Sequence, residues 1–402
     1  MGAIVQMLNA AILITVLACG ALLLYPKLAN APMWRATITP LASIIGSGFL
    51  VLGPILGVSF GLYAPLVMLT LVVIAYGFGS TIRYNIGRID AVAHRPAVVE
   101  RIEPFASMVL AFAYIISVAY YLNLFGAFGV SLTPFDDPYY AKLLTTAVFL
   151  LILIVGWTKG FAALERMEQI SVGVKLAIIG GLLCGLAIHF GDTAQNGALT
   201  FNAANVTGWS AVTLIFGLIV TVQGFETSRY LGRHYDAKTR IRSMRLAQIL
   251  STLIYMVYIV LLTYALSPGI ITLDETSIID MIAVVAPILP VLLVAAALSA
   301  QFSAAVADTS GSGGLMAEVS KNRIPPHLAY AILVGAGLFL TWTLNIFEII
   351  SYASRAFAAY YAIQAGIAAT SAWLRRDMKK LMIFTPLALL GICIAVFGQP
   401  VE

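Results

Sequence analysis

The chain has 402 residues, of which 61% are hydrophobic and only 10% charged, with a net charge of +5 and a mean hydropathy of +0.96. A soluble domain carries about a quarter charged residues, so this composition excludes a water-facing globular protein and predicts a chain that is dissolved in lipid. The basic residues fall in short loops between apolar segments, a pattern that indicates membrane orientation and argues against a nucleic-acid partner.

Twelve segments are long and apolar enough to cross a bilayer. A crossing helix needs about 17–25 mostly apolar residues to span a hydrocarbon core of roughly 30 Å. Such segments lie near 4–24, 37–58, 62–82, 104–130, 139–157, 168–190, 209–231, 245–266, 283–306, 327–345, 347–373 and 379–398. We therefore expect an all-α polytopic membrane protein with about twelve transmembrane helices.

The loops between these segments alternate in charge. Lys and Arg gather in the loops after the first, third, fifth, seventh, ninth and eleventh segments, whereas the intervening loops are neutral or acidic. Basic loops face the cytoplasm, so we expect both termini on the extracytoplasmic side of a cell membrane, which we expect to be a bacterial inner membrane. The first segment could instead be a leader cleaved near 29–31, but no basic region precedes it.

Short runs that contain glycine and polar residues interrupt two of the twelve segments near their centres. The runs are Ile45, Gly46, Ser47 and Gly48 in the second segment, and Gln223, Gly224, Phe225 and Glu226 in the seventh. Irregular backbone at membrane depth is tolerated where it lines a cavity, and a pair of interrupted helices in corresponding halves is the pattern of a transporter built from inverted repeats. The alternative is that the glycines serve only close helix packing.

A broken helix offers free backbone groups to a ligand. The amides of the half-helix after the break attract an anionic group such as a carboxylate, and the carbonyls before it can hold an ammonium group or a cation. Tyr114, Ser117 and Tyr121 also form one polar face of the fourth segment. We expect the substrate between the two breaks, with Tyr121 beside it; the alternative for this face is helix packing.

Short motifs along the chain resemble one family of transporters. Residues 44–49 resemble the glycine motif in the first core helix of the amino acid–polyamine–organocation (APC) superfamily, and 224–226 resemble its broken sixth core helix. The basic stretch 233–245 resembles the loop that follows, and 313–326 resemble the end of the eighth core helix. The chain departs from the family pattern by an extra helix before the core, by one helix after it where many members have two, and by a third segment without a family signature.

The resemblance implies a fold and a function. The fold would be the leucine-transporter type, with five plus five helices in inverted repeats at 36–190 and 209–373. Residues 1–35 would add an N-terminal helix and linker, and 374–402 a C-terminal helix. The function would be secondary active transport, by alternating access, of a small organic solute such as an amino acid or related amine, coupled to H⁺ or Na⁺.

One lysine lies deep in the predicted membrane region. Lys175 stands midway along the sixth segment, and an ionisable group at that depth usually marks a transport pathway. In proton-coupled members of the family that the chain resembles, a lysine at this place in the fifth core helix fills the position of a sodium ion. The alternatives are a lysine that extends to the interface or one in a structural ion pair.

Two further charges lie within predicted segments. Asp308 could pair with Lys175, or it could bind Na⁺ together with the hydroxyls of Thr309 and Ser310, since hard cations prefer oxygen ligands. The alternative is that the ninth segment ends earlier and Asp308 is exposed to water. Arg355, about nine residues into the eleventh segment, needs a partner such as Glu226 or a substrate anion.

Motifs for other kinds of chemistry are missing from the sequence. It contains no P-loop, no metal-ligand spacing among its histidines and cysteines, and no nucleophile–base cluster that we recognise. We therefore expect no enzymatic activity, no cofactor and no metal. The remaining alternatives are a carrier of inorganic ions or nucleobases on the same fold and, from a different class, a non-transporting membrane sensor or a membrane enzyme.

Overall fold

The computed structural model describes residues 2–46, 48–89, 97–158, 161–233, 235–266, 274 and 276–401. Ser47, one of the predicted substrate-binding residues, lies outside them. The α-helices are α1 (Gly2–Leu24), α2 (Pro26–Ala29), α3 (Pro32–Ile44), α4 (Gly48–Phe60), α5 (Ala64–Ile89), α6 (Ala97–Val130), α7 (Pro138–Thr158), α8 (Phe161–Gln195), α9 (Gly208–Gly217), α10 (Ala237–Ala265), α11 (Ile278–Ala283), α12 (Leu289–Val319), α13 (Pro326–Thr343), α14 (Ile346–Leu374) and α15 (Met378–Phe397). Three 3₁₀ helices are η1 (Gly61–Tyr63), η2 (Ile219–Val222) and η3 (Phe225–Arg233).

The predicted helical membrane protein is confirmed. Among the described residues, nine helical stretches are long and apolar enough to cross a membrane, and one of them, 48–88, contains both α4 and α5. The helix α14 and the interrupted segment made of α9, η2 and η3 account for the other two expected crossings. The ninth crossing is shifted from its predicted position, because α12 begins at Leu289 and continues to Val319.

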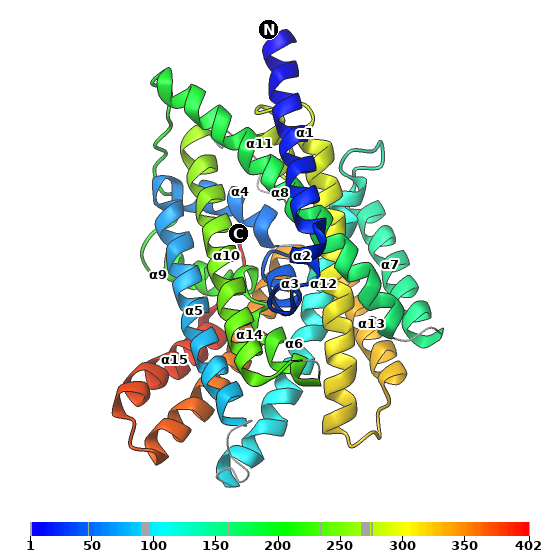
Figure 1. Ribbon diagram of the computed structural model, residues 1–402, viewed down its shortest axis with the longest axis vertical. Helices are drawn as coiled ribbons and strands as arrows, with labels where there is room; N and C mark the ends of the chain where they lie inside the picture. Colours follow the sequence, from blue (N-terminus) through cyan, green and yellow to red (C-terminus); the bar gives the residue numbers. More distant parts are fainter. Residues whose placement is uncertain are drawn as a thin grey trace.

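The two halves of the second crossing, α3 and α4, lie in the middle of the molecule (Figure 1). In the view of Figure 1, α5 and α10 run along the left of them and α7 and α13 along the right. Nearly every residue of α4 is buried, whereas only 6% of the apolar window of α1 and 17% of that of α15 are buried. The helices α1 and α15 are therefore peripheral and offer most of their apolar surface to lipid.

The first helix packs against α8 through small residues. A Cβ atom added to Gly181 would overlap the Val16 side chain, and one added to Gly180 would lie 2.8 Å from the Cys19 sulfur. Small residues allow two helices to approach closely inside a membrane, where burial of apolar surface does not drive association. The extra N-terminal helix is thus fitted to the core by glycines of α8.

Side chains cap the N-termini of several long helices. Asp236 accepts a hydrogen bond from the Thr239 amide at the start of α10, and Asn345 and Glu348 form a reciprocal capping box at the start of α14. The hydrogen bonds from Thr239 lower the pKa of the Asp236 carboxyl, which keeps the capping group charged.

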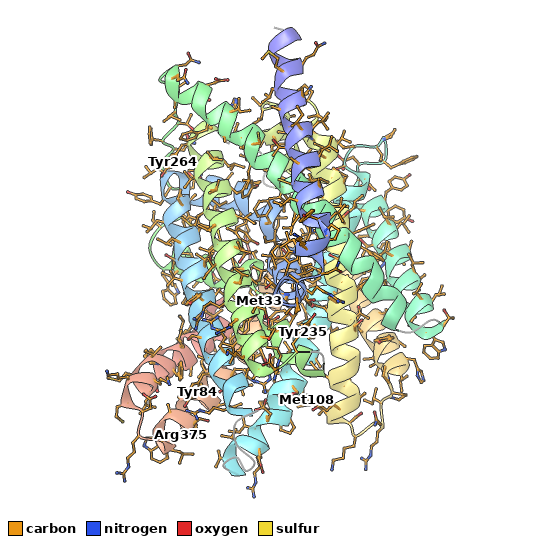
Figure 2. The ribbon with its side chains drawn as sticks, viewed as in Figure 1. Met33, Tyr84, Met108, Tyr235, Tyr264 and Arg375 are labelled. Atoms are coloured by element: carbon orange, nitrogen blue, oxygen red, sulfur yellow. The ribbon has the colours of Figure 1, made fainter. Side chains whose placement is uncertain are left out.

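Figure 2 shows Tyr84 and Arg375 near one end of the molecule and Tyr264 near the other.

Candidate functional site

The second crossing is broken where the sequence predicts. The helix α3 ends at Ile44, and α4 begins at Gly48. Ile45 leaves the helical conformation with φ −85° and ψ 54°, although its amide still donates to the Leu41 carbonyl over 2.9 Å. Because the first four amides of a helix have no partner within it, the buried start of α4 offers donors that are not used by its own helix.

The seventh crossing is broken in the same way. The helix α9 ends at Gly217 and the short helix η2 at Val222, and Gln223 is then extended with ψ 176°. Gly224 has φ +118°, a conformation that L side chains rarely adopt. The chain continues from Phe225 as the 3₁₀ helix η3, so two interrupted helices, five crossings apart, meet in the core.

Glycines bring the two breaks into direct contact. A Cβ atom on Gly48 would lie 2.6 Å from the Cα atom of Thr221, and one on Gly224 would lie 2.5 Å from the Ser43 hydroxyl oxygen. Each break therefore holds a glycine that faces backbone or side-chain atoms of the other break. Close packing, the alternative explanation of these glycines, occurs here together with the helix breaks rather than instead of them.

The carbonyl ends of both broken helices have polar partners. The Lys175 ammonium, fully buried on α8, donates to the Ala42 carbonyl over 2.6 Å. The Tyr255 hydroxyl on α10 lies 2.6 Å from the Thr221 carbonyl and 3.0 Å from the Ile44 carbonyl, so its single proton is shared between the two breaks. Such carbonyls are the groups that hold cations in transporters with broken helices.

Beside the second break lies a cluster of buried polar side chains. The Gln223 amide donates to the Tyr121 hydroxyl over 2.8 Å. One Glu226 oxygen accepts from the Tyr361 hydroxyl at 2.9 Å and from the Gly224 amide at 3.0 Å. The Oε1 atoms of Gln223 and Glu226 have no hydrogen-bond partner in the part of the chain that the structure describes. The break therefore presents two buried acceptors.

The face predicted on the fourth crossing points inward. Ser117 donates to the Asp308 carboxylate, and the Tyr114 ring packs against Phe357, with ring centroids 5.8 Å apart. Together with the contact between Tyr121 and Gln223, these contacts turn the whole face of α6 toward α12 and the breaks. The face contributes to the core, whether or not a substrate touches it.

Asp308 is buried and not exposed to water. It is 1% exposed and lies within α12, eleven residues before its end at Val319, so the alternative of a water-exposed helix end is wrong. Thr309 donates to the Ala305 carbonyl of its own helix, and Ser310 has no hydrogen-bond partner among the described residues. A Lys175–Asp308 pair and a cation site at 308–310 both stay predictions.

Arg355 does not reach Glu226. Its guanidinium is partly exposed and donates to the Ala395 carbonyl of α15. Glu226, for its part, accepts from Tyr361 and Gly224, as described above. Within the described chain, Arg355 thus joins the C-terminal helix to α14, and its suggested pairing with Glu226 is wrong because α15 supplies a closer acceptor.

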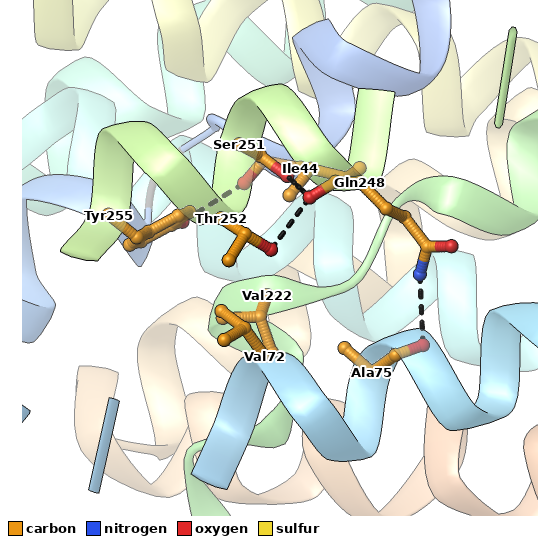
Figure 3. A pocket seen from close by; sticks show the side chains of 8 residues that line it. All are labelled: Ile44, Val72, Ala75, Val222, Gln248, Ser251, Thr252 and Tyr255. Carbon is orange, nitrogen blue, oxygen red and sulfur yellow. Dashed lines mark hydrogen bonds between the residues drawn. The ribbon is translucent and has the colours of Figure 1, made fainter. Parts of the chain in front are cut away.

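A small cavity lies next to both breaks. It is lined by Ile44, Val72, Ala75, Val222, Gln248, Ser251, Thr252 and Tyr255 (Figure 3). Its free volume of about 10 Å³ is close to the space that one water molecule needs. The Gln248 amide donates to the Ala75 carbonyl at 2.9 Å and accepts from Arg83. The closely packed walls formed by α5 and α10 hold the ends of the two broken helices in place.

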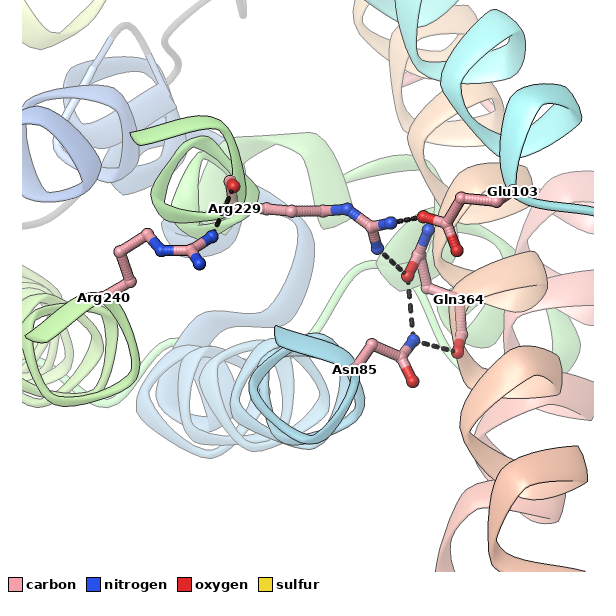
Figure 4. A network of polar contacts seen from close by, with 5 residues as sticks. All are labelled: Asn85, Glu103, Arg229, Arg240 and Gln364. Carbon is pink, nitrogen blue, oxygen red and sulfur yellow. Dashed lines mark hydrogen bonds and ion pairs between the residues drawn. The ribbon is translucent and has the colours of Figure 1, made fainter. Parts of the chain in front are cut away.

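One turn beyond Glu226, a polar network joins five helices. Arg229 of η3 forms an ion pair with Glu103 of α6 and donates to the Gln364 side chain of α14 (Figure 4). Asn85 of α5 donates to the Gln364 side-chain and backbone oxygens at 2.9 Å, and Arg240 of α10 donates to the Arg229 carbonyl at 2.9 Å. The network therefore connects η3, which follows the second break, to α5, α6, α10 and α14.

A comparison with protein families identifies the chain. A family model described as APC superfamily transporter matches residues 26–398. The chain belongs to the APC superfamily. The family is one of transporters and not a class of enzymes. The resemblance inferred from the glycine motifs is thus confirmed.

One sequence relative and one solved structure are similar to this APC transporter. It is 39% identical over 391 residues to an uncharacterized protein of Aquifex aeolicus (strain VF5), with 94% of each chain covered. Among solved structures it is similar to Mhp1, a nucleobase-cation-symport-1 family transporter, in a closed conformation with bromovinylhydantoin bound. That likeness has a TM-score of 0.59 at 11% identity and covers 86% of this chain and 79% of the other, so it supports the inverted-repeat fold.

Sequence reasoning missed the residues that connect distant segments. Tyr255 lies in an apolar segment whose tyrosines resemble interfacial or packing residues, and Glu103 lies near a predicted segment end. Polar side chains inside apolar segments are themselves a signal, because membrane helices rarely keep them without a partner. That signal was sufficient to select Lys175 and Glu226 as candidate site residues, but it could not identify the hydrogen-bond partner of either.

Proposed function

We propose that the protein is a secondary active transporter that imports an amino acid or a related amine and binds it between the two helix breaks. The start of α4 offers free amides to a carboxylate, and the unpaired oxygens of Gln223 and Glu226 offer acceptors to an ammonium group. Ile45, Gly46, Ser47, Gly48, Phe225 and Tyr121 would complete the site. A zwitterion matches this arrangement, since it carries both charges a few ångströms apart.

One contact supports a proton as the coupling ion. The Lys175 ammonium lies 2.6 Å from the Ala42 carbonyl, at the end of a broken helix where a metal cation would otherwise be held. We infer that this ammonium takes the place of Na⁺ and that a proton on Lys175 couples transport to the pH gradient. Asp308, Thr309 and Ser310 are the second candidate, as ligands of Na⁺.

A carrier of nucleobases on the same fold is the second candidate for the substrate. The Tyr361 ring stacks on Phe225 and on Phe78, each with 5.1 Å between ring centroids, and aromatic faces of this kind suit planar heterocycles. The similar structure of Mhp1, from a nucleobase-cation-symport-1 family, gives this alternative its second support.

A ligand screen followed by a flux measurement tests the proposal. Purified protein would be heated with amino acids, amines and nucleobases in turn, because a ligand of the native state raises the apparent melting temperature. The stabilising compound would then be measured by counterflow in proteoliposomes. Amino acid or amine exchange supports the proposal, nucleobase exchange supports the second candidate, and stabilisation without exchange would indicate a non-transporting sensor.

The orientation in the membrane is part of the same proposal. Because the basic loops alternate with neutral or acidic ones, we propose that both termini face the extracytoplasmic side of a bacterial-type inner membrane. The network around Arg229 then lies on the cytoplasmic side of the substrate. Labelling of single cysteines near both termini by an impermeant reagent in intact cells would test this orientation.

A further inference from the structure

One buried side chain near the breaks has no partner in the described part of the chain. Gln301, twelve residues after the start of α12 at Leu289, is 0% exposed. Neither its Oε1 nor its Nε2 atom has a hydrogen-bond partner among the described residues. Buried side-chain amides almost always find a partner, because an unpaired polar group loses its hydration without compensation. We therefore expect the Gln301 amide to form hydrogen bonds with a group outside the described residues.

Neighbouring residues of α12 place Gln301 at the height of the first break. Ala304 lies 3.9 Å from the position that a Cβ atom on Gly46 would take. Ala296 and Leu50 line one small apolar cavity together. Gln301 lies between Ala296 and Ala304 along α12, at a rise of 1.5 Å per residue. Its level is therefore that of the start of α4, whose first amides have no partner within their own helix.

The face of α12 that carries Gln301 is turned to the site. Gln301, Ala304 and Asp308 are spaced by three and four residues, so they share one side of the helix. Ala304 of this side meets Gly46, and Asp308 meets Ser117 of α6. The unpaired amide thus belongs to the side of α12 that packs around the breaks.

We propose that Gln301 determines substrate specificity by pairing with a group that presents an N–H donor and a C=O acceptor side by side, such as the carboxamide or ureido group of an amino acid side chain. This inference rests on the proposed function and names the class of amino acid. A carboxylate would satisfy only Nε2 and an ammonium group only Oε1, whereas an aliphatic side chain would leave both unpaired. Glutamine reads the donor–acceptor edge of a nucleobase by the same two bonds.

Three of the side chains with unpaired atoms near the breaks have different roles in the proposed site. Gln223 and Glu226 offer oxygens alone, which suits the substrate ammonium. Gln301 offers both a donor and an acceptor, which suits a neutral amide. A site built to hydrogen-bond a polar group rejects the analogue that lacks it much more strongly than an apolar pocket rejects an extra polar atom. We therefore expect discrimination against aliphatic amino acids.

Competition between matched amino acids tests the proposal. L-Asparagine, L-glutamine and L-citrulline would be compared with L-leucine and L-methionine, which have similar size, as competitors of uptake and in thermal stabilisation. The variants are Gln301→Leu and Gln301→Met, with Gln195→Leu at the exposed end of α8 as control. Two variants of different shape keep the test valid if one of them fails to fold.

The expected result is a preference of at least about tenfold for the amide-bearing series in the wild type and in Gln195→Leu. In either Gln301 variant this preference should vanish or reverse. Equal competition by both series in the wild type, or an unchanged preference in the variants, would overturn the role of Gln301 and leave amino acid transport standing. If neither series binds but another amino acid or an amine does, the role of Gln301 is overturned and the proposed function stands; if no amino acid or amine binds, both fail.

Discussion

Gly48 provides the sharpest test of how the two breaks meet. A Cβ atom at this position would lie 2.6 Å from both the Cα and Cβ atoms of Thr221. Carbon atoms in contact prefer about 3.5–4.0 Å, so Gly48→Ala must separate the breaks by roughly 1 Å. Overpacking of a tight core costs about 1–3 kcal/mol. The larger Gly48→Val should abolish uptake while the protein still inserts.

Gly57 in the same helix gives a matched control. It is buried in α4, but no atom of another described element lies within 4 Å of the position that a Cβ atom would take there. Replacing a helical glycine by alanine where space allows stabilises by about 0.4–1 kcal/mol. The assays are thermal unfolding in detergent and uptake into proteoliposomes. Equal stability and equal uptake of Gly48→Ala and Gly57→Ala would refute the contact between the breaks.

Three further substitutions test other parts of the site. Tyr255→Phe removes the hydroxyl shared by both breaks and should lower the free energy of unfolding by about 1–3 kcal/mol, measured by thermal unfolding; an unchanged melting temperature would contradict the shared bond. Glu103→Gln breaks the largely buried pair with Arg229 and should cost up to about 3–5 kcal/mol, with faster labelling of cysteines from the cytoplasmic side. Lys380→Gln, in an exposed pair, is its control and should change stability by no more than about 1 kcal/mol. Asn345→Ala removes the cap of α14 and should destabilise by about 0.5–2 kcal/mol, whereas Asn345→Asp should keep most of the stability in the same unfolding assay.

The broken helices could be predicted because lipid leaves the chain few choices. Gly46, Gly48 and Gly224 interrupt apolar segments, and Glu226 would be intolerable against hydrocarbon. The positions of the helix breaks could therefore be predicted from these residues alone, without knowing which residues they contact. The depth of Lys175 was predictable for the same reason, and its contact with the Ala42 carbonyl agrees with that depth.

The contacts between distant segments could not be predicted in the same way. The ion pair between Glu103 and Arg229 joins residues 126 positions apart, and nothing local to either residue selects the other. The pairing predicted for Arg355 failed for this reason, since α15 offered it the Ala395 carbonyl instead. Asp308 was ambiguous because apolarity alone does not locate the end of a helix that continues through small and polar residues.

The central claim is that Lys175 couples transport to protons at a break between two half-helices. The most direct measurement is uptake of the stabilising ligand into proteoliposomes under an imposed pH gradient, with and without Na⁺, for the wild type and Lys175→Ala. We expect wild-type uptake to follow the proton gradient and to be independent of Na⁺. We expect Lys175→Ala still to bind the ligand but to exchange it without responding to the gradient. Uptake that depends strictly on Na⁺ would contradict the claim and assign the coupling ion to Asp308, Thr309 and Ser310.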